Sequence, residues 1–400
     1  MIAALLVFLA TYFVLTVGRL PGFRIDRTGA SIIGASLMIA FGVLTMEQAI
    51  RSVNYDTLIL LFGMMIVVAN LRVSGFFGLV SAWAVEHTRH PLALLTAIVL
   101  VSGFFSAFFV NDTMCLVLTP LVLDIVERLR RNPVPYLLAI AMASNIGSAA
   151  TITGNPQNMM IGSFSQIPYR TFAAAIAPIS AVGLLLTIAL IAVAYRREFF
   201  GVPRIAVERS RVVVHRALLW KSIAAAGAMI ALFFAGLPVP TVAVVTGAIL
   251  LVTRRVKPER IYREIDWSLL VLFAGLFVVI AGVEQALLTG HARALVERLQ
   301  LDRTGVLTAW SAILSNVVSN VPAVLVFKPF VSRLPDSQHA WLTLAMSSTL
   351  AGNLTVLGSM ANLIVIERSR RSVTISFLEY LKVGIPLTLL SLAIGVLLLR

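Results

Sequence analysis

The chain has 400 residues, of which 59% are hydrophobic and 12% charged, whereas soluble domains average about 45–50% and about 25%. This composition excludes an ordinary soluble enzyme or binding domain. The formal net charge of +14 lies in short loops between apolar segments, a distribution typical of membrane topology and not of nucleic-acid binding. The single cysteine, Cys115, excludes a disulfide within the chain.

Apolar segments of membrane-spanning length follow one another along the whole chain. We predict an all-α polytopic membrane protein with about ten transmembrane helices, two re-entrant hairpins and two interrupted helices. The predicted crossings lie near residues 2–18, 28–45, 56–73, 136–163, 172–194, 219–236, 240–253, 266–284, 340–366 and 381–399. Because the first segment lacks a basic leading region and a small-residue cleavage pattern, we interpret it as a span and not as a signal peptide.

Two further apolar segments, 92–127 and 304–332, are each interrupted by a polar tip. The tips read VNDT at 110–113 and SNVP at 319–322. Charged residues flank both ends of each segment. We therefore predict two helical hairpins that enter and leave the membrane by the same face.

Basic residues are distributed unevenly between the two sides of this layout. Most of them lie on one side of the membrane if the following loops are assigned to the cytoplasm: 19–27, 86–92, 128–135, 195–218, 254–265 and 367–380. An excess of basic residues marks the cytoplasmic face of a membrane protein. This excess is obtained only if the two hairpins do not cross the membrane. We predict a multi-pass protein of the cell inner membrane with a periplasmic amino terminus.

The two halves of the chain resemble each other. VNDTMCLVLTPLV, which starts at residue 110, matches SNVPAVLVFKPFV, which starts at residue 319. SNIGSAATITGNPQNMMI, from residue 144, matches STLAGNLTVLGSMANLIV, from residue 348. Each half has five crossings, an odd number, so the second half is predicted to be inverted in the membrane. The predicted organisation is a first repeat at 1–194 (hairpin 92–127, broken helix 136–163), a basic cytoplasmic loop at 195–218 and a second repeat at 219–400 (hairpin 304–332, broken helix 340–366).

Helix-breaking residues lie in the middle of one span of each half. Gly154 and Pro156 interrupt the first, and Asn155 reads as the N-cap of a new half-helix. Gly358 and Ser359 are predicted to do the same in the second. Both half-helices would direct unpaired backbone N–H groups at a common centre, which the hairpin tips also reach. The candidate substrate- and ion-binding residues are Asn111, Asp112, Thr113, Ser144, Asn145, Thr151, Gly154, Asn155, Asn158, Ser319, Asn320, Thr355, Gly358, Ser359 and Asn362.

These amides, hydroxyls and backbone groups suit a small oxygen-rich anion or a neutral oxyacid. Amide and carbonyl oxygens near Asn111, Asn155, Asn320 and Gly358 form a candidate Na+ site. Asp112 is a candidate proton carrier, because an ionisable group inside the membrane is costly and usually functional. The alternative interpretation is that Asp112 only caps the returning arm of its hairpin.

Three charged residues of interest lie outside the tips. The role of the first is left open, and the other two are interpreted as structural. Lys328, in the second hairpin, either attracts anions or extends to the membrane surface. Asp56 and Asp266 each begin a span and are interpreted as helix-start charges. With one cysteine and no histidine inside a predicted span, we predict no catalytic residues, no resident metal or cofactor, and no enzyme activity.

At these residues the sequence resembles the ion transporter superfamily. That group includes the arsenite/antimonite permeases (ArsB), the NhaD-type sodium/proton antiporters, the melanosomal P protein, and the citrate and divalent-anion:sodium symporters. The tip FFVNDTMCLVLTP and the segment SNVPAVLV are similar to the arsenite permeases, whereas NIGSAATITGNPQNMMI is more similar to the P protein and the dicarboxylate symporters. The resemblance implies that Asn111, Ser319 and Asn320 bind substrate and cation, that hairpins and broken helices move in an elevator-like manner, and that the protein often forms a homodimer. The symporters carry a Ser-Asn-Thr tip in each hairpin, and the missing Thr of the second tip here weakens a dicarboxylate assignment.

We therefore expect an ion-coupled secondary active transporter of a small anion or oxyacid, of the arsenite/antimonite efflux or the citrate/dicarboxylate type. The alternative is a sodium/proton antiporter of the NhaD type. Coupling to Na+ or H+ is left open. The expected partners are a small inorganic or carboxylate anion and the lipid bilayer, with no nucleic acid. The chain has no GxxxxGK[ST] motif, so any ATP drive would come from a separate ATPase subunit.

Overall fold

The computed structural model describes residues 2–18, 24–88, 90–200, 214–253, 256–288 and 298–399. Within these ranges helices joined by short connections make up the fold, which confirms the predicted all-α class. Six of the described helices are long and apolar enough to cross a membrane. They are α4 (Tyr55–Ser74), α6 (Pro91–Phe108), α10 (Tyr169–Ala194), α12 (Arg216–Phe234), α15 (Trp267–Val283) and α21 (Phe377–Leu398).

Shorter elements lie between these helices. They are α1 (Ile2–Val17), α2 (Arg27–Ala40), α3 (Met46–Ser52), α5 (Phe76–His87), α11 (Arg196–Phe199), α13 (Val239–Leu251), α14 (Pro258–Tyr262) and the π-helical turn η1 (Glu284–Leu288). The span predicted at 28–45 is shorter in the structure, because α2 ends at Ala40, where Gly42 adopts a φ of 67° and Val43 N donates to Met38 O at 3.0 Å. A new helix, α3, begins at Met46. Thr45 and Gln48 form a capping box there, in which Gln48 N donates to Thr45 Oγ1 at 3.2 Å and Thr45 N donates to Gln48 Oε1 at 2.9 Å.

Both predicted hairpins and both predicted broken helices are present. The hairpins pair α6 with α7 (Asn111–Arg128), and α17 (Thr304–Val318) with α18 (Asn320–Val331). The broken helices are α8 (Pro133–Ala149) followed by α9 (Pro156–Ser165), and α19 (Ser337–Ala351) followed by the 3-10 turn η2 (Val356–Gly358) and α20 (Met360–Ser369). The interruptions therefore lie at the polar tips and breaker residues that the sequence indicated.

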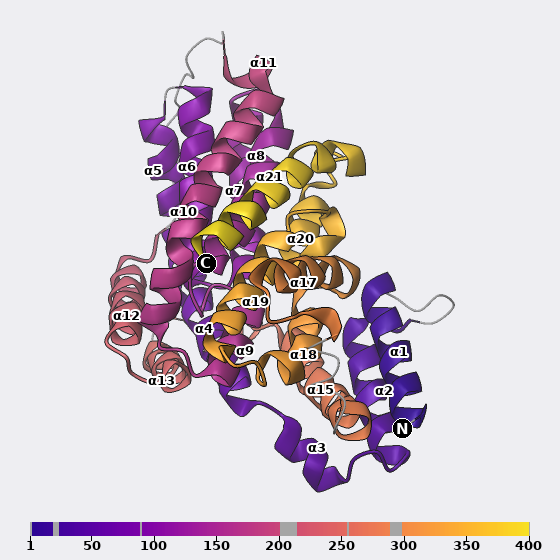
Figure 1. The fold of residues 1–400 in the computed structure, drawn as a ribbon. Coiled ribbons are helices and arrows are strands. Elements are labelled where there is room, and N and C mark those ends of the chain that lie inside the picture. Colours follow the sequence, from indigo (N-terminus) through magenta and orange to yellow (C-terminus); the bar gives the residue numbers. More distant parts are fainter. Residues whose placement is uncertain are drawn as a thin grey trace.

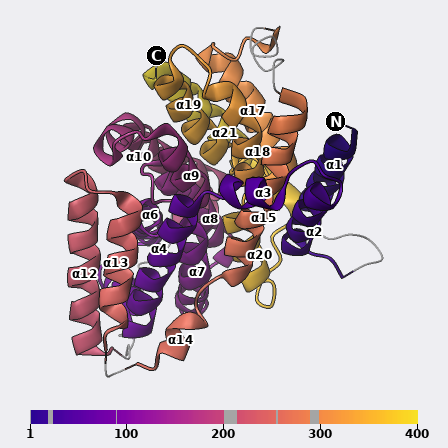
Figure 2. The same ribbon diagram turned by 90° about the horizontal axis from the view of Figure 1, so that it is seen from below.

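The hairpins and broken helices lie between two peripheral groups of helices. Figure 2 shows α4, α12 and α13 on one side, and α1, α2 and α15 on the other. Each group takes two helices from one half of the chain and one from the other half. The halves are therefore interleaved and not laid side by side, and the segment containing α3 connects the two groups along the lower edge of Figure 1.

The packing of the central helices repeats between the halves. α6 packs on α8 as α17 packs on α19, within each half. Across the halves, α20 packs on α7 and α8, just as α9 packs on α18 and α19. Each half-helix after a break is thus held by the hairpin and broken helix of the opposite half.

The outer surface carries large apolar side chains, as a surface in contact with lipid requires. Leu185, Val193, Leu389 and Leu397 are all more than half exposed. Together with the six long apolar helices, this surface identifies a multi-pass membrane protein.

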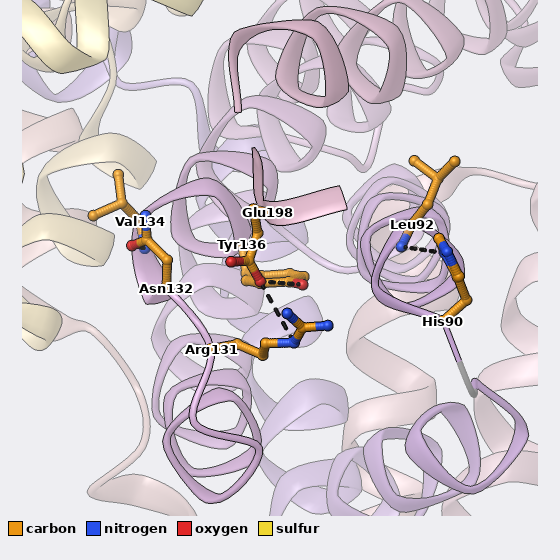
Figure 3. Close-up of polar contacts among 7 residues, drawn as sticks. All are labelled: His90, Leu92, Arg131, Asn132, Val134, Tyr136 and Glu198. Atoms are coloured by element: carbon orange, nitrogen blue, oxygen red, sulfur yellow. Dashed lines mark hydrogen bonds and ion pairs between the residues drawn. The ribbon is translucent and has the colours of Figure 1, made fainter. Parts of the chain in front are cut away.

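The connection between α7 and α8 is fastened to α11 by polar contacts (Figure 3). Tyr136 donates from its hydroxyl to Glu198 Oε1 at 3.2 Å, and Arg131 Nε lies 3.8 Å from the same oxygen. Asn132 caps α8 by accepting from Val134 N at 3.1 Å, as His90 caps α6 by accepting from Leu92 N at 3.2 Å. Proline follows each cap, so both helices begin with a side-chain acceptor and a residue preset for the helical conformation.

The contact between α6 and α8 depends on glycine. A Cβ atom at Gly147 would lie 2.1 Å from the carbonyl oxygen of Gly103, which is a backbone atom that cannot rotate away. The two helices therefore approach more closely than any side chain would allow, as is common between membrane helices. In contrast, a Cβ atom at Gly227 in α12 would meet nothing within 4 Å.

We predict that Gly147→Ala lowers the thermal unfolding midpoint in detergent, because added volume in a close-packed contact costs about 1–3 kcal/mol. The matched control is Gly227→Ala, which places the same methyl group in open space. This variant should be neutral or up to about 1 kcal/mol more stable, since alanine favours helix over glycine. Equal effects of the two substitutions would contradict the close approach of α6 and α8.

Candidate functional site

A cavity of about 870 Å³ lies between the central helices and the group formed by α1, α2 and α15. Both hairpin tips reach it, through Asn111 and Asp112 of the first and Ser319 and Asn320 of the second. The starts of the half-helices α9 and α20 and the amino-terminal ends of α2 and α15 complete the lining. The predicted convergence of two tips and two half-helices is therefore a single space in the structure.

Asn145 connects the two halves of the chain directly behind this cavity. Its amide nitrogen donates to Asn353 Oδ1 at 2.9 Å and to Asn362 Oδ1 at 3.0 Å. Its carbonyl oxygen accepts from Asn111 Nδ2 at 3.1 Å and from Ser359 Oγ at 2.9 Å. Every partner except Asn111 belongs to the second half, and Asn145 is completely buried.

Thr349, the counterpart of Asn145 in the second half, makes the reciprocal contacts. Its hydroxyl group accepts from Asn155 Nδ2 and from Gln157 Nε2, each at 3.3 Å. It also lies 3.5 Å from Asn158 Oδ1. The residue in the middle of each broken helix thus holds the start of the opposite half-helix, although a hydroxyl replaces the amide in the second half.

Two asparagines stabilise the irregular backbone at the breaks. Asn158 Nδ2 donates to the carbonyl oxygens of Ser148 at 3.2 Å and Thr151 at 3.0 Å. Asn362 Nδ2 donates to the equivalent carbonyls, those of Gly352 at 2.7 Å and Thr355 at 3.1 Å. These bonds satisfy carbonyl groups that a broken helix leaves free inside the membrane, where water cannot reach them.

Gly154 and Gly358, the glycines at the two breaks, allow two backbone segments to approach each other closely. A Cβ atom at Gly154 would lie 2.1 Å from the carbonyl oxygen of Ser148, and one at Gly358 would lie 2.9 Å from that of Gly352. Asn155 and Ser359 follow them as N-caps and accept from Asn158 N at 2.8 Å and from Ala361 N at 3.2 Å. In the structure, Gly154 and Gly358 therefore allow a close backbone contact, and Asn155 and Ser359 cap the half-helices that follow.

The candidate residues divide into a lining set and a supporting set. The cavity is lined by Asn111, Asp112, Ser319, Asn320 and Ser359. The supporting set lies behind it and consists of Ser144, Asn145, Thr151, Gly154, Asn155, Asn158, Thr355, Gly358 and Asn362. Thr113 is half-buried and does not line the cavity.

Three supporting hydroxyls hold backbone or side-chain groups near the tips. Ser144 Oγ donates to the carbonyl oxygen of Asn111 at 3.1 Å. Thr151 donates to the carbonyl of Ala107, at the end of α6. Thr355 donates to Asn316 Oδ1 at 3.2 Å in the second half. These hydroxyl groups position the two hairpins.

The first hairpin tip presents unused hydrogen-bond acceptors. Asn111 is 3% exposed, and its Oδ1 atom has no hydrogen-bond partner. Asp112 lines the same cavity and makes no hydrogen bond or ion pair with any residue that the structure describes. A buried polar group without a partner costs about 1–3 kcal/mol, and Asn111 Oδ1 is one of several such side-chain atoms among the described residues, Asn70 Oδ1 in α4 included.

Ser319 at the second tip has a strained backbone. Its φ of 76° and ψ of 161° lie in a region that residues other than glycine rarely adopt. In the orientation that satisfies its amide, Asn320 donates to the carbonyls of Gly358 at 3.1 Å and Ser348 at 3.0 Å, and accepts from Gln157 at 3.2 Å. The second tip is thus held by hydrogen bonds at Asn320 while Ser319 remains strained.

Most of the other lining residues were not among the sequence candidates, and they include the polar side chains of Asp26, Arg27, Gln157 and Asp266. Asp26 and Asp266 are the N-caps of α2 and α15, accepting from Gly29 N at 2.8 Å and Leu269 N at 2.9 Å. The helix-start interpretation of Asp266 is therefore correct, and the same side chain also lines the cavity. A single sequence does not show which helix-capping aspartates also line a cavity.

Lys328 does not line the cavity. Its Nζ lies 3.5 Å from Glu284 Oε2 and 5.2 Å from the centre of the Phe164 ring. The lysine therefore links α18 to η1, at the end of α15.

A smaller hollow of about 350 Å³ occupies the corresponding position in the other half. It lies at the starts of α4 and α13 and the end of α12, against α9, and of the described residues its lining includes neither hairpin tip. Tyr169 lines it, with its hydroxyl group 2.9 Å from Thr153 Oγ1 and its ring 5.3 Å from that of Phe233. One of the two equivalent spaces is thus wide and reaches both tips, whereas the other is narrow.

A comparison with protein families agrees with this architecture. The model of a family described as citrate transporter matches residues 10–351. The chain belongs to this citrate transporter family. The resemblance to ion-transporter permeases is thereby confirmed, and the family consists of transporters and not of enzymes.

Individual relatives cover almost the whole chain. A 46 kDa membrane protein of Mycobacterium leprae is 29% identical over 96% of this chain and 96% of its own length. The silicon efflux transporter LSI3 of Oryza sativa subsp. japonica is 30% identical over 94% of this chain and 93% of its own. The crystal structure of the Alcanivorax borkumensis YdaH transporter superposes with a TM-score of 0.55, covering 99% of this chain and 95% of that one at 16% identity. The last similarity supports the fold alone.

We predict that Asn145→Leu destabilises this membrane transporter by at least about 3 kcal/mol, because it leaves several buried amide and hydroxyl groups without partners. The matched control is Asn70→Leu in α4. Asn70 is equally buried, but its one described bond, from Nδ2 to Ile66 O at 2.9 Å, lies within its own helix. This control should change stability by no more than about 1 kcal/mol in thermal unfolding. Similar losses in both variants would show that Asn145 is not a bridge between the halves.

Proposed function

We propose that the protein is an ion-coupled secondary transporter of the inner membrane, which binds a small oxygen-rich solute between its two hairpin tips. The observation that carries this proposal is the unsatisfied Oδ1 atom of buried Asn111, in a cavity that both tips line. A structural amide in a membrane protein is normally paired. Asn111 is also among the residues that line the cavity, which is large enough for a small solute and several water molecules.

The two unequal spaces support a transport role. The wide cavity lies at the starts of α2 and α15, which follow two of the six basic loops predicted to be cytoplasmic. We assign it to the cytoplasmic side, with the narrow hollow on the periplasmic side. Because inverted repeats can exchange conformations, widening the narrow hollow at the expense of the cavity would give the bound solute access to the opposite face.

The comparisons favour two kinds of solute. The family description names citrate, whereas the rice relative is named for silicon efflux. Citrate is small and oxygen-rich, and so is dissolved silicon in the form of its oxyacid, so either solute is compatible with a site of amides, hydroxyls and carboxylates.

We assign ion coupling to Asp112. Its carboxylate is unpaired, lies on a hairpin and lines the same cavity as that of Asp266. Two negative charges in one cavity repel each other, and protonation of Asp112, or a bound cation, would remove this repulsion. The same pair favours the second candidate function, sodium/proton antiport without a second solute.

We predict that Asn111→Ala reduces solute flux in proteoliposomes by roughly tenfold or more, since removing a hydrogen bond to a buried ligand costs about 1–3 kcal/mol. The control is Asn132→Ala, which removes a helix cap of α8 at a distance from the cavity. Unchanged flux in Asn111→Ala, with the protein correctly folded, would remove the proposed site.

Asp112→Asn tests coupling separately from binding. We expect solute exchange down its own gradient to persist, while accumulation driven by a proton or sodium gradient is lost, because an amide cannot exchange a proton. The control is Asp124→Asn on the same helix, where the carboxylate pairs with Arg128 at the exposed end. Gradient-driven accumulation by Asp112→Asn equal to that of the native protein would exclude Asp112 as the coupling group.

A further inference from the structure

Two central helices, α9 and α18, are each linked to a peripheral helix by a polar contact. On α18, Lys328 Nζ lies 3.5 Å from Glu284 Oε2, in the π-helical turn that follows α15. On α9, the Ser163 hydroxyl donates to Oδ1 of Asn54, the N-cap of α4, at 3.0 Å. Because α4 and α15 belong to different peripheral groups, the central helices are fastened to both groups.

Phe164 connects the two links. It follows Ser163 in the chain, and the Lys328 ammonium group lies 5.2 Å from the centre of its ring. The same ring lies 6.3 Å from that of Phe277 in α15. The Lys328 and Glu284 side chains are 35% and 34% exposed, so their charges are partly shielded from water. A shielded ion pair with an aromatic ring beside its cation is held more firmly than a pair on an open surface.

The links lie at the end of α9 that forms the narrow hollow. Ser163 lines this hollow together with Gly162 and Gln166. The starts of α4 and α13 form the opposite wall, so the hollow widens only if α9 moves away from α4 and the bond from Ser163 to Asn54 breaks. Since α9 also packs on α18, the same movement pulls on the ion pair.

The first hairpin has no equivalent ion pair at the position of Lys328. In the alignment that pairs Asn111 with Asn320, Lys328 corresponds to Thr119. Thr119 Oγ1 donates to the carbonyl oxygen of Cys115 at 2.7 Å, within its own helix. This hydroxyl is therefore used inside α7.

The second half-helix differs from the first in the same way. In the alignment that pairs Gly154 with Gly358, Ser163 corresponds to Glu367. Glu367 Oε2 lies 3.9 Å from Arg370, three residues later, and both side chains are about three-quarters exposed. The polar links to peripheral helices are thus found at the narrow hollow, whereas their repeat-related counterparts form contacts within their own segments. The asymmetry of the links matches the asymmetry of the two spaces.

We propose that the contacts Lys328–Glu284 and Ser163–Asn54 form a two-point latch, which holds the narrow hollow closed and opens once in every transport cycle. This inference rests on the proposed function and specifies which contacts keep one of its two faces shut. A contact made in only one of two conformations stabilises that conformation, so its removal shifts the population toward the other. The π-helical turn that carries Glu284 is a local irregularity of a kind frequent at functional sites.

The latch can be loosened without removing its neighbours. Lys328→Met removes the charge and keeps an unbranched side chain over Phe164. Ser163→Ala removes one hydroxyl, while Asn54 still caps α4 by accepting from Thr57 N at 2.8 Å. Neither variant alters a residue that lines the wide cavity.

A charge exchange and a matched control separate the ion pair from general loosening. Lys328→Glu combined with Glu284→Lys restores an ion pair of reversed polarity between the same two positions. The control is Arg128→Met, which breaks the ion pair with Asp124 inside α7 and touches no peripheral helix.

Reporter cysteines measure which space is open. Met159 is buried and lines the narrow hollow, whereas Leu272 is half-buried and lines the wide cavity. Met159→Cys and Leu272→Cys are introduced one at a time and labelled with a water-soluble maleimide in lipid nanodiscs, where both faces are accessible. Each variant without a reporter gives the background from Cys115, which is buried.

We expect slow labelling at Met159→Cys and faster labelling at Leu272→Cys in the otherwise native protein. Lys328→Met combined with Ser163→Ala should raise the first rate several-fold and lower the second. The charge exchange and Arg128→Met should both give rates close to the native ones. Native rates in the loosened variant, or a rise at both reporters, would overturn the latch, and a charge exchange that labels like Lys328→Met would overturn the role of the ion pair.

Flux is measured separately, so that the latch and the transport function can fail independently. The native protein and the loosened variant are reconstituted in proteoliposomes with citrate, arsenite or a sodium gradient. Normal flux of a solute with labelling that does not respond overturns the latch and leaves transport standing. Labelling that shifts as expected, without flux of any probe in the native protein, supports the latch as a conformational device and counts against the proposed function.

Discussion

The central constraint on this fold is that irregular backbone inside a membrane must find its hydrogen bonds within the protein. Asn145 meets this constraint by joining the break of one half to the half-helix of the other, through Asn353, Asn362 and Ser359. The same residue holds Asn111 at the first hairpin tip. One hydrogen-bond network therefore both supports the interrupted backbone and positions Asn111 at the site. Neither half can form this network alone.

Much of this arrangement could be predicted because the informative residues are breakers and amides at constant spacing. Asn111 and Asn320 mark the hairpin tips, and Gly154 and Gly358 mark the breaks, since each has a backbone role that few other residues fill. The cavity wall could not be predicted in this way. Asp266 caps α15 like any helix-start aspartate, and only the packing of α15 against the opposite half brings it to the site. Likewise, α2 ends early because Gly42 adopts a positive φ, and the capping box at Thr45 then starts α3, neither of which a hydrophobicity pattern registers.

The two halves share a framework but differ where chemistry is concentrated. Thr349 stands in place of Asn145 and offers one hydroxyl where the first half has an amide with two donors and an acceptor. The first tip carries Asp112, whereas Val321 stands at the equivalent position of the second tip, where Ser319 is strained. The symmetric architecture thus leaves two unequal spaces, and under the proposed function the asymmetric residues would confine ligand binding to the larger one.

The strained backbone of Ser319 affects how the second hairpin moves. A residue held in that region stores about 1–3 kcal/mol, which is retained only while the neighbouring contacts enforce it. A movement of α18 that loosened those contacts would release this energy, so the strain lowers the free-energy cost of leaving the described conformation. Under the proposed transport function, a ligand at the tips would then need less binding energy to shift the second hairpin.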